Sequence, residues 1–359
     1  MNDVGILTIL MFVAGLALLV GGADWLVRGA ARIAAASGIS PLVIGLTIVA
    51  YGTSAPELAV SVGAAWAGEA DLGLGNIVGS NIVNVLLILG ASALITPLRV
   101  ATQLIRIDVP IMIVLSLVTY LMAADRLVGR IDGAILFIGA VAYTAMLMRI
   151  GRSEPAEEVL DGSGRTSGFV TNVGLILIGL AALVLGSNWL VDSSVAFATA
   201  LGVSELIIGL TIVAIGTSLP EVATSLVAAA RGERDIAVGN VVGSCIFNIL
   251  SVLGISALVA PAGLAVPSAL LSFDLPVMVA VAVACLPIFA RGASIERWEG
   301  GLFLFYYAAY TTYLVLAAQK HAALPAFSSA MQLFVIPLTI LTLVVVFWRS
   351  WRRGMYSAA

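Results

Sequence analysis

Two glutamates, Glu57 and Glu221, end the same short polar pattern in two apolar parts of the chain. Residues 52–57 read Gly-Thr-Ser-Ala-Pro-Glu, and residues 216–221 read Gly-Thr-Ser-Leu-Pro-Glu. Each glutamate lies about half-way along a run that could span a membrane, with no Arg or Lys at that depth. A carboxylate inside a membrane is costly without a partner, so we expect each glutamate to bind a cation.

The glycine and proline of each pattern predict a break in the helix that carries it. Proline removes a backbone hydrogen-bond donor and disfavours helical geometry in the residue before it. Backbone carbonyls near Ala50 and Ala214 should then be free to bind a cation, which the partial negative charge at the end of the first half-helix would favour. Non-helical backbone at this depth is tolerated where it lines a cavity or is buried in protein.

Other oxygen-bearing side chains accompany both glutamates. Ser80 and Asn84 are four residues apart and share a helix face, and Ser244 and Asn248 repeat that spacing. Hard cations such as Ca²⁺ and Na⁺ bind oxygen ligands of this kind, whereas Zn²⁺ or copper would need His or Cys. The predicted ligand set is Glu57, Glu221, Thr53, Ser54, Thr217, Ser218, Ala50, Ala214, Ser80, Asn84, Ser244 and Asn248.

The number of carboxylates indicates what such a site could carry. Two ionised glutamates that face one another match one divalent cation, or two or more monovalent cations that share neighbouring oxygens. A site that either cargo can neutralise, but not both together, is the physical basis of exchange.

Structural interpretations compete with this one. A single Gly-Thr-Ser-x-Pro-Glu pattern could be a packing kink whose carboxylic acid stays neutral, but two copies with matching companions favour a binding site. Asp24 and Arg28 are four residues apart, which predicts a structural ion pair. Asp108 and Asp274 each lie two residues before a proline, which predicts helix N-caps.

The composition places these motifs in a membrane. Apolar residues make up 61% and charged residues 10% of the 359-residue chain, and the mean hydropathy is +1.13. A net charge of −3, with basic residues scattered at segment ends, gives no sign of nucleic-acid binding. The single histidine cannot form a His-rich metal site, and both cysteines lie in apolar runs, which predicts small buried side chains and no disulfide.

Apolar runs of spanning length predict eleven transmembrane helices. Helices 2 and 7 contain the two Gly-Thr-Ser-x-Pro-Glu patterns. The polar stretch at 151–168 predicts a solvated linker. The expected spans are 5–35, 41–67, 72–95, 104–124, 131–150, 170–200, 205–230, 236–259, 269–290, 299–318 and 330–348.

An internal repeat organises these helices. Residues 45–90 and 209–254 align without a gap at an offset of about 164 positions, with roughly 28 of 46 residues identical. Each repeat has five helices, and an odd number makes the two copies enter the membrane from opposite sides. The sequence therefore predicts an all-α polytopic membrane protein with an inverted five-plus-five helix repeat, broken helices 2 and 7, and an extra C-terminal helix. The expected parts are a first repeat at 1–150, a cytoplasmic linker at 151–168, a second repeat at 169–320 and the additional helix at 327–348.

The basic residues predict how the chain is oriented. With the N-terminus outside, about 14 of the 17 Lys and Arg residues lie on the cytoplasmic side. The linker and the C-terminus are then cytoplasmic.

With these paired motifs, the sequence resembles the cation/calcium exchanger superfamily, and within it the prokaryotic calcium/sodium antiporters of the sodium/calcium exchanger family. The superfamily's two alpha-repeats carry Gly-Thr-Ser-x-Pro-Glu/Asp and Gly-Ser-Asn-x-x-Asn/Asp motifs. The resemblance covers the first ten helices and implies that Glu57 and Glu221 are the principal Ca²⁺ ligands. It further implies Na⁺ and Ca²⁺ oxygens from Thr53, Ser54, Thr217 and Ser218, carbonyls from Ala50 and Ala214, and further ligands from Ser80, Asn84, Ser244 and Asn248.

Two positions depart from that pattern. Residue 245 is Cys where the superfamily usually has Asn, which suggests that this side chain is not indispensable. Residue 248 is Asn where potassium-dependent relatives carry Asp, which favours a site with two formal charges.

The expected function is an antiporter that exchanges Na⁺ for Ca²⁺ by alternating access in a bacterial-type inner membrane, extruding Ca²⁺ on the inward Na⁺ gradient. Helices 1 and 6 are expected to slide against a bundle of helices 2, 3, 7 and 8. A Ca²⁺/H⁺ antiporter is the main alternative, and a cation channel is a weaker one. The chain has no HExxH or GxSxG motif, so we expect no enzyme, no cofactor and no obligate protein partner.

Overall fold

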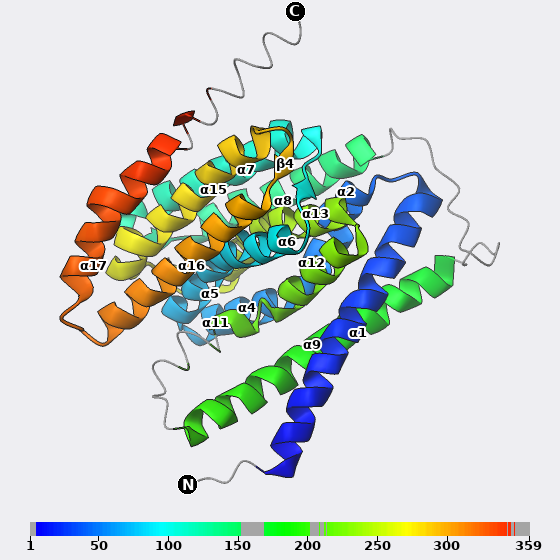
Figure 1. The fold of residues 1–359 in the computed structure, drawn as a ribbon, viewed down its shortest axis with the longest axis horizontal. Helices are drawn as coiled ribbons and strands as arrows, with labels where there is room; N and C mark the ends of the chain where they lie inside the picture. The colour runs from blue at the N-terminus through cyan, green and yellow to red at the C-terminus, as the bar shows by residue number, and fades with distance from the viewer. Residues whose placement is uncertain are drawn as a thin grey trace, which may run out of the picture.

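The computed structural model describes residues 5–151, 169–201, 208, 212, 214–342, 344–345 and 348, and most of these residues are helical (Figure 1). In this part of the chain, nine helices and one bent helix pair are long and apolar enough to cross a membrane. They match nine of the eleven predicted spans within two residues, and the last, predicted at 330–348, is found at Leu324–Thr342. The remaining span, predicted at 205–230, lies partly outside the described residues.

The first repeat begins with α1 (Ile6–Ser37). Its second span consists of α2 (Pro41–Ile44), a π-helical turn η1 (Gly45–Val49), α3 (Ala50–Thr53) and α4 (Ala55–Ala67). The third is α5 (Ala70–Val83), η2 (Asn84–Leu89) and α6 (Gly90–Ile95), followed by strand β1 (Leu98–Arg99). The fourth is η3 (Leu104–Asp108), α7 (Val109–Met122) and η4 (Ala123–Asp125), and after β2 (Leu127–Val128) the fifth is α8 (Arg130–Ile150).

The second repeat follows the same order. It contains α9 (Phe169–Ala200), α11 (Ala214–Gly216), α12 (Leu219–Arg231), α13 (Arg234–Phe247), η7 (Asn248–Leu253), α14 (Gly254–Val259) and β3 (Leu264–Ala265). It continues with η8 (Leu270–Asp274), α15 (Leu275–Ala290), β4 (Ser294–Ile295) and α16 (Arg297–Ala318). The predicted linker lies outside the described residues except for Gly151.

The additional C-terminal span runs over Leu324–Thr342 and includes α17 (Leu324–Ala330) and η9 (Met331–Val335). It begins earlier than predicted because Pro325 fits the first turn of a helix, where no N–H is needed. Figure 1 shows this span at the edge of the molecule, beside α15 and α16.

The packing of α1 against α9 confirms the inverted repeat. A Cβ atom on Gly15 would lie 2.9 Å from the carbonyl oxygen of Gly186, and one on Gly22 would lie 2.8 Å from that of Gly179. Each step of seven residues up α1 therefore matches a step of seven down α9, so the two equivalent helices run in opposite directions. They lie side by side along one edge of the molecule (Figure 1), where α1 also packs against α12.

The short strands pair in the way that a two-fold rotation between repeats produces. Strands β3 and β4 occupy in the second repeat the places that β1 and β2 occupy in the first. Strand β1 pairs antiparallel with β4, and β2 pairs antiparallel with β3. The rotation that exchanges the repeats thus converts one sheet into the other.

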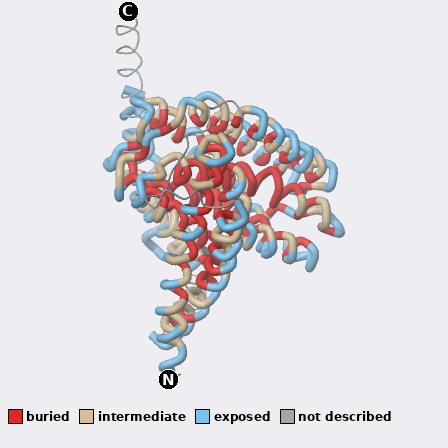
Figure 2. Tube along the Cα trace, turned by 90° about the vertical axis from the view of Figure 1, so that its right-hand side faces the viewer, coloured by how far each residue is buried: buried red, intermediate tan, exposed pale blue. Residues whose placement is uncertain are grey.

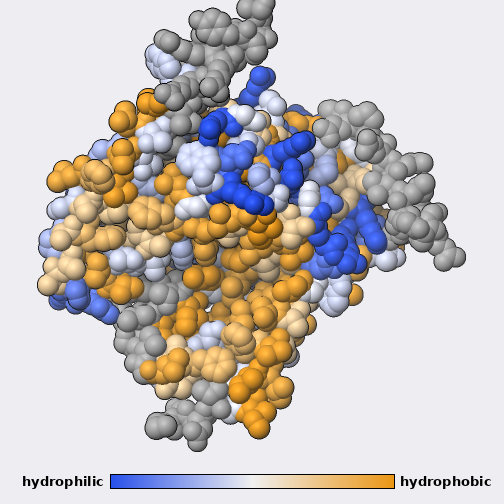
Figure 3. Space-filling model, viewed as in Figure 1, coloured by the Kyte–Doolittle hydropathy of each residue, from blue (hydrophilic) through white to orange (hydrophobic). Residues whose placement is uncertain are grey.

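The third and eighth spans form the centre of the protein. The apolar windows of Ala70–Ile95 and Arg234–Val259 are 78% and 83% buried, against 22% for α1 and 33% for α9. Buried residues accordingly gather in the middle of the molecule (Figure 2). On the face drawn in Figure 3 the middle is largely hydrophobic, as a surface facing lipid should be, and hydrophilic residues gather near the top. A Cβ on Gly243 would lie 2.8 Å from Leu46 Cα, so the eighth span packs closely against the first half of the broken second span.

The π-helical turns are a feature that we did not predict. One π turn begins at Asn84 and its counterpart begins at Asn248. A π turn adds a residue to a helical turn, which changes the face that the following side chains share, and such turns gather at functional sites. The surrounding runs are almost uniformly apolar, so their periodicity gives no sign of the extra residue.

Prediction for the helix pair. Gly22→Val should lower the stability of the folded protein by about 1–3 kcal/mol, because the new side chain would meet rigid backbone of α9. Gly21→Val is the matched control, since no atom lies within 4 Å of a Cβ at Gly21. Thermal melting of both purified variants checks this; equal melting temperatures would contradict the close packing of α1 and α9.

Candidate cation-binding site

Both predicted helix breaks are present. Ser54, with φ −82° and ψ 9°, separates α3 from α4, and the two halves of this span are bent by 48°. Ser218 has almost the same conformation, φ −86° and ψ 3°, immediately before α12. Pro56 and Pro220 stand in the first turn after each break, so Glu57 and Glu221 lie in the first turn of the second half-helix.

The carbonyl of Ala50 differs from the expectation. It accepts a hydrogen bond from the Ser54 N–H at 3.0 Å, so it keeps a backbone partner. Proline removes the donor that would serve the carbonyl of Gly52, two residues further on. In the second copy the Ser218 N–H donates to the Ile215 carbonyl at 3.0 Å. Cation binding by the Ala50 and Ala214 carbonyls stays a prediction.

The two repeats exchange hydrogen bonds at the glutamates. The Ser54 hydroxyl donates to Glu221 Oε1 at 2.6 Å, and the Ser218 hydroxyl donates to Glu57 Oε1 at 3.0 Å. Both glutamates are only 1% exposed. Each carboxylate is therefore held by the broken helix of the other repeat.

The serines of the central helices adjoin the same hydroxyls. Ser244 Oγ lies 3.0 Å from Ser54 Oγ, and Ser80 Oγ lies 3.2 Å from Ser218 Oγ. The structure thus brings these four predicted residues together with the two glutamates in one buried cluster.

Four buried oxygens in this cluster have no hydrogen-bond partner. They are Oε2 of Glu57 and of Glu221, and Oδ1 of Asn84 and of Asn248. Buried polar atoms are nearly always satisfied, so an unpaired one needs an explanation. Two carboxylate and two amide oxygens, in two repeat-related pairs, are of the kind that a hard cation binds, so the four stay predicted ligands.

Among the described residues, no basic side chain forms an ion pair with either carboxylate. Ion pairs instead join Asp24 to Arg28 and to Arg231, and Arg291 to Glu299. None of them includes Glu57 or Glu221. A cation is then the charge partner that the arrangement can accept.

The predicted threonines reach asparagines that sequence reasoning missed. The Thr53 hydroxyl donates to Asn240 Oδ1 at 3.1 Å, and Asn240 Nδ2 in turn donates to Ser225 at 2.9 Å. The chain Thr217–Asn76–Ser61 repeats this arrangement, with distances of 3.0 Å and 2.9 Å. The signal was present, because both asparagines and both serines are identical in the two copies.

Asn81 makes the site asymmetric. Its Oδ1 accepts from Asn248 Nδ2 at 3.1 Å, and its Nδ2 donates to the Cys245 carbonyl at 3.3 Å. With its nitrogen held in this way, Asn248 keeps its own oxygen free. The equivalent of Asn81 is Cys245, which has no amide with which to hold Asn84.

The structure also shows the partners of the three aspartates that the sequence analysis singled out. The predicted pair of Asp24 and Arg28 is present at 2.8 Å, and Arg231 of α12 joins it. Asp108 and Asp274 are not N-caps, contrary to the prediction: they accept hydrogen bonds from Tyr143 at 2.9 Å and Tyr310 at 2.8 Å. Their spans begin earlier, in π turns, so both carboxylates lie inside a helix.

Comparison with known proteins decides the family. The family described as sodium/calcium exchanger protein matches residues 7–149 and 171–316. This chain belongs to the sodium/calcium exchanger family. It is a multi-pass membrane transporter and not an enzyme, as the sequence predicted.

The similarity to known proteins extends over most of this chain and nearly all of each relative. CaxA of Alkalimonas amylolytica is 42% identical over 305 residues, which cover 82% of this chain and 95% of the relative. Sodium/calcium exchanger MaX1 of Methanosarcina acetivorans is 34% identical over 346 residues, covering 85% and 97%. A structure of the sodium–calcium exchanger NCX_Mj, soaked with Na⁺ and Sr²⁺, has a TM-score of 0.75 at 34% identity and covers 86% of this chain and 98% of that one.

Prediction for Asn81. Asn81→Ala should weaken Ca²⁺ binding about fivefold, because a hydrogen bond of about 1 kcal/mol no longer orients the Asn248 amide. Cys245→Ala is the control and should leave affinity within about a factor of two. Titration of each purified variant with Ca²⁺, at matched melting temperatures, measures this. Unchanged affinity in Asn81→Ala would show that Asn81 does not position Asn248.

Proposed function

We propose that this exchanger carries Na⁺ and Ca²⁺ in opposite directions by alternating access, through the buried cluster around Glu57 and Glu221. The observation that carries the proposal is the set of four unpartnered oxygens from Glu57, Glu221, Asn84 and Asn248. The names of MaX1 and NCX_Mj, both sodium/calcium exchangers, support the choice of ions. Thr53, Ser54, Thr217, Ser218, Ser80 and Ser244 are proposed to contribute hydroxyl oxygens, with Ala50 and Ala214 contributing carbonyls.

Ca²⁺ and Na⁺ compete for the same two carboxylates, and this competition couples the movement of one ion to that of the other. One Ca²⁺ balances two negative charges, and Na⁺ ions can balance the same charges only when Ca²⁺ has left. An empty site would leave both carboxylates buried without charge partners, which is costly in a membrane. The occupied site is therefore the form that crosses between its two open states.

Helices α1 and α9 are proposed to be the moving unit. The described glutamates are almost completely buried, so access to the site requires a rearrangement. Helix α9 lies directly over both breaks: a Cβ on Gly52 would lie 2.7 Å from Leu180, and Ser187 donates to the Gly216 carbonyl at 2.7 Å. The close glycine contacts between α1 and α9 suit two helices that slide together.

The direction of transport and the placement in the cell follow from charge. We propose that the protein lies in a bacterial-type inner membrane with its N-terminus outside and its C-terminus in the cytoplasm, as the basic residues favour. Ca²⁺ would leave the cell on the inward Na⁺ gradient. Asn248, a neutral residue, favours a cycle without K⁺.

Prediction for the glutamates. Proteoliposomes loaded with Na⁺ and diluted into Na⁺-free buffer should take up radioactive Ca²⁺. Glu57→Gln and Glu221→Gln should each lower this uptake at least 100-fold, because one carboxylate cannot balance Ca²⁺, a loss of about 2.7 kcal/mol or more. Glu69→Gln, at an exposed position between α4 and α5, should keep normal uptake. Uptake that follows a pH gradient and ignores Na⁺ would replace the proposal with Ca²⁺/H⁺ antiport, and Ca²⁺ flux without a counter-ion would indicate a channel.

Prediction for the moving helices. Cysteines at Asp24 and Arg231, which form an ion pair between α1 and α12, should stop exchange when cross-linked while Ca²⁺ still binds. Cysteines at Phe12 and Phe197, whose rings lie 5.5 Å apart across α1 and α9, should not stop it, because both helices move together. The native Cys245 and Cys285 are buried and should not react. Continued exchange after the first cross-link would refute the sliding of α1 against α12.

A further inference from the structure

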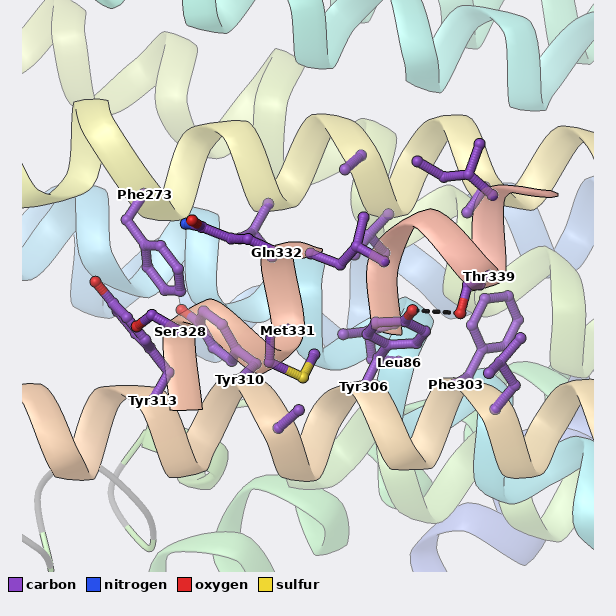
Figure 4. A pocket seen from close by; sticks show the side chains of 18 of the residues that line it. Leu86, Phe273, Phe303, Tyr306, Tyr310, Tyr313, Ser328, Met331, Gln332 and Thr339 are labelled. Carbon is purple, nitrogen blue, oxygen red and sulfur yellow. Dashed lines mark hydrogen bonds between the residues drawn. The ribbon is translucent and has the colours of Figure 1, made fainter. Parts of the chain in front are cut away.

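A cavity of about 300 Å³ separates the additional C-terminal span from the ten-helix core. Figure 4 shows it between α15, α16 and the last span, with Leu86 of the third span also at its wall. The lining side chains are largely apolar and include Val277, Ala284, Phe303 and Met331. The last span has no buried residue in its apolar window, so it rests on the core only loosely.

The two ends of the cavity differ in polarity. At one end the Tyr306 hydroxyl donates to Thr339 Oγ1 at 2.6 Å, which ties α16 to the last span and uses the polar atoms there. At the other end lie Tyr313, Ser328 and Gln332 (Figure 4). The cavity thus runs from an end where the polar atoms of Tyr306 and Thr339 bind each other to an end that carries Tyr313, Ser328 and Gln332.

The polar end is close to the membrane surface. Tyr313 lies five residues before the end of α16 at Ala318, and Ser328 lies four residues after the start of α17 at Leu324. At 1.5 Å per residue, both are within about 8 Å of the helix ends. The connection between the two helices carries Lys320 and His321, both exposed.

The walls of the cavity limit its occupant. A helix is about 10 Å across, and the hydrogen bond between Tyr306 and Thr339 holds the last span too close to α16 for a helix of a second copy to pass between them. Water has few partners on such walls, because apolar cavities stay dry. A flexible hydrocarbon chain is thin enough to enter and matches the apolar lining.

We propose that this cavity binds one acyl chain of an anionic phospholipid, whose phosphate lies beside Lys320. The apolar tail would extend from the polar end towards Tyr306 and fill the space between the last span and the core. Tyr313, Ser328 and Gln332 would meet the ester groups, and the positive charge of Lys320 would favour a phosphate at the interface. The lipid thereby becomes part of the packing that holds the additional helix, and this site is separate from the cation cluster.

Native mass spectrometry tests the proposal with 1-palmitoyl-2-oleoyl phosphatidylglycerol as the probe. Ala309 lines the cavity, so Ala309→Trp should fill it and lower the retained lipid at least tenfold. The matched control is Ala308→Trp, at an exposed residue of the same helix that does not line the cavity; it should retain the lipid as the original protein does. Lys320→Gln should lower retention several-fold. Equal retention in Ala309→Trp, or no retained lipid in the original protein, would overturn the proposal.

Photo-cross-linking gives a second measurement that does not depend on filling the cavity. A photoreactive methionine analogue at Met331 lies on the cavity wall and preserves the shape of the side chain. An adduct with the mass of the phospholipid, formed in reconstituted membranes, supports the proposal. An adduct with a peptide of a second copy contradicts the proposal. The absence of any lipid adduct contradicts it too. Ca²⁺ uptake by the same sample shows that the protein is folded.

Discussion

The burial of two carboxylates without a basic partner is the constraint on which the rest of this structure depends. Each glutamate receives one hydrogen bond from a serine of the other repeat, which satisfies one oxygen and leaves the second unpaired. Neither repeat can therefore complete its own half of the cluster. The serines reach across because both helices break at the same place, and the breaks are sheltered by the two central spans, the most buried of the nine long helices among the described residues. Fold and site impose the same requirement, that the two copies face each other.

An exact two-fold relation would give the two open states of an alternating-access cycle equal energies, and two contacts among the described residues depart from that relation close to the site and to α1. Asn81 holds the Asn248 amide, whereas Cys245 offers no amide to Asn84. Asp24 binds Arg231, but the equivalent residues are Asn188 and Ala67, which cannot form an ion pair. Ion pairs in partly buried positions contribute more than those in open water, so the second contact can favour one position of α1. The two repeats thus provide the site and the helices around it, and the contacts that differ between the repeats affect the relative free energies of the two open states.

The features that the sequence predicted are those that arise within a single segment or from its exact duplication. Proline acts on the backbone beside it, so the two breaks followed from residues 52–57 and 216–221 alone, and the inverted fold followed from counting helices. The contacts across repeats were not predictable in this way. Asn76 and Asn240 pair with threonines of the opposite repeat, which only the packing of four helices determines. Asp108 and Asp274 were misassigned as caps because π turns extend their helices backward, and an apolar run gives no periodic sign of a π turn.

The neutral Asn248 has a consequence for the charge that the proposed cycle moves. With two carboxylates, one Ca²⁺ or two Na⁺ make the occluded cluster neutral, while a third Na⁺ would leave a positive charge of one in a medium of low dielectric constant. That third ion could enter only where the excess charge is shared by amide and hydroxyl oxygens, of which Asn84 and Asn248 keep two unpaired. An exchange of two Na⁺ for one Ca²⁺ moves no net charge, but three Na⁺ move one, and each such charge gains or loses about 2.3 kcal/mol per 100 mV of membrane potential. In the proposed exchange of Na⁺ for Ca²⁺, these two amide oxygens are thus the groups on which a contribution of the membrane voltage would depend.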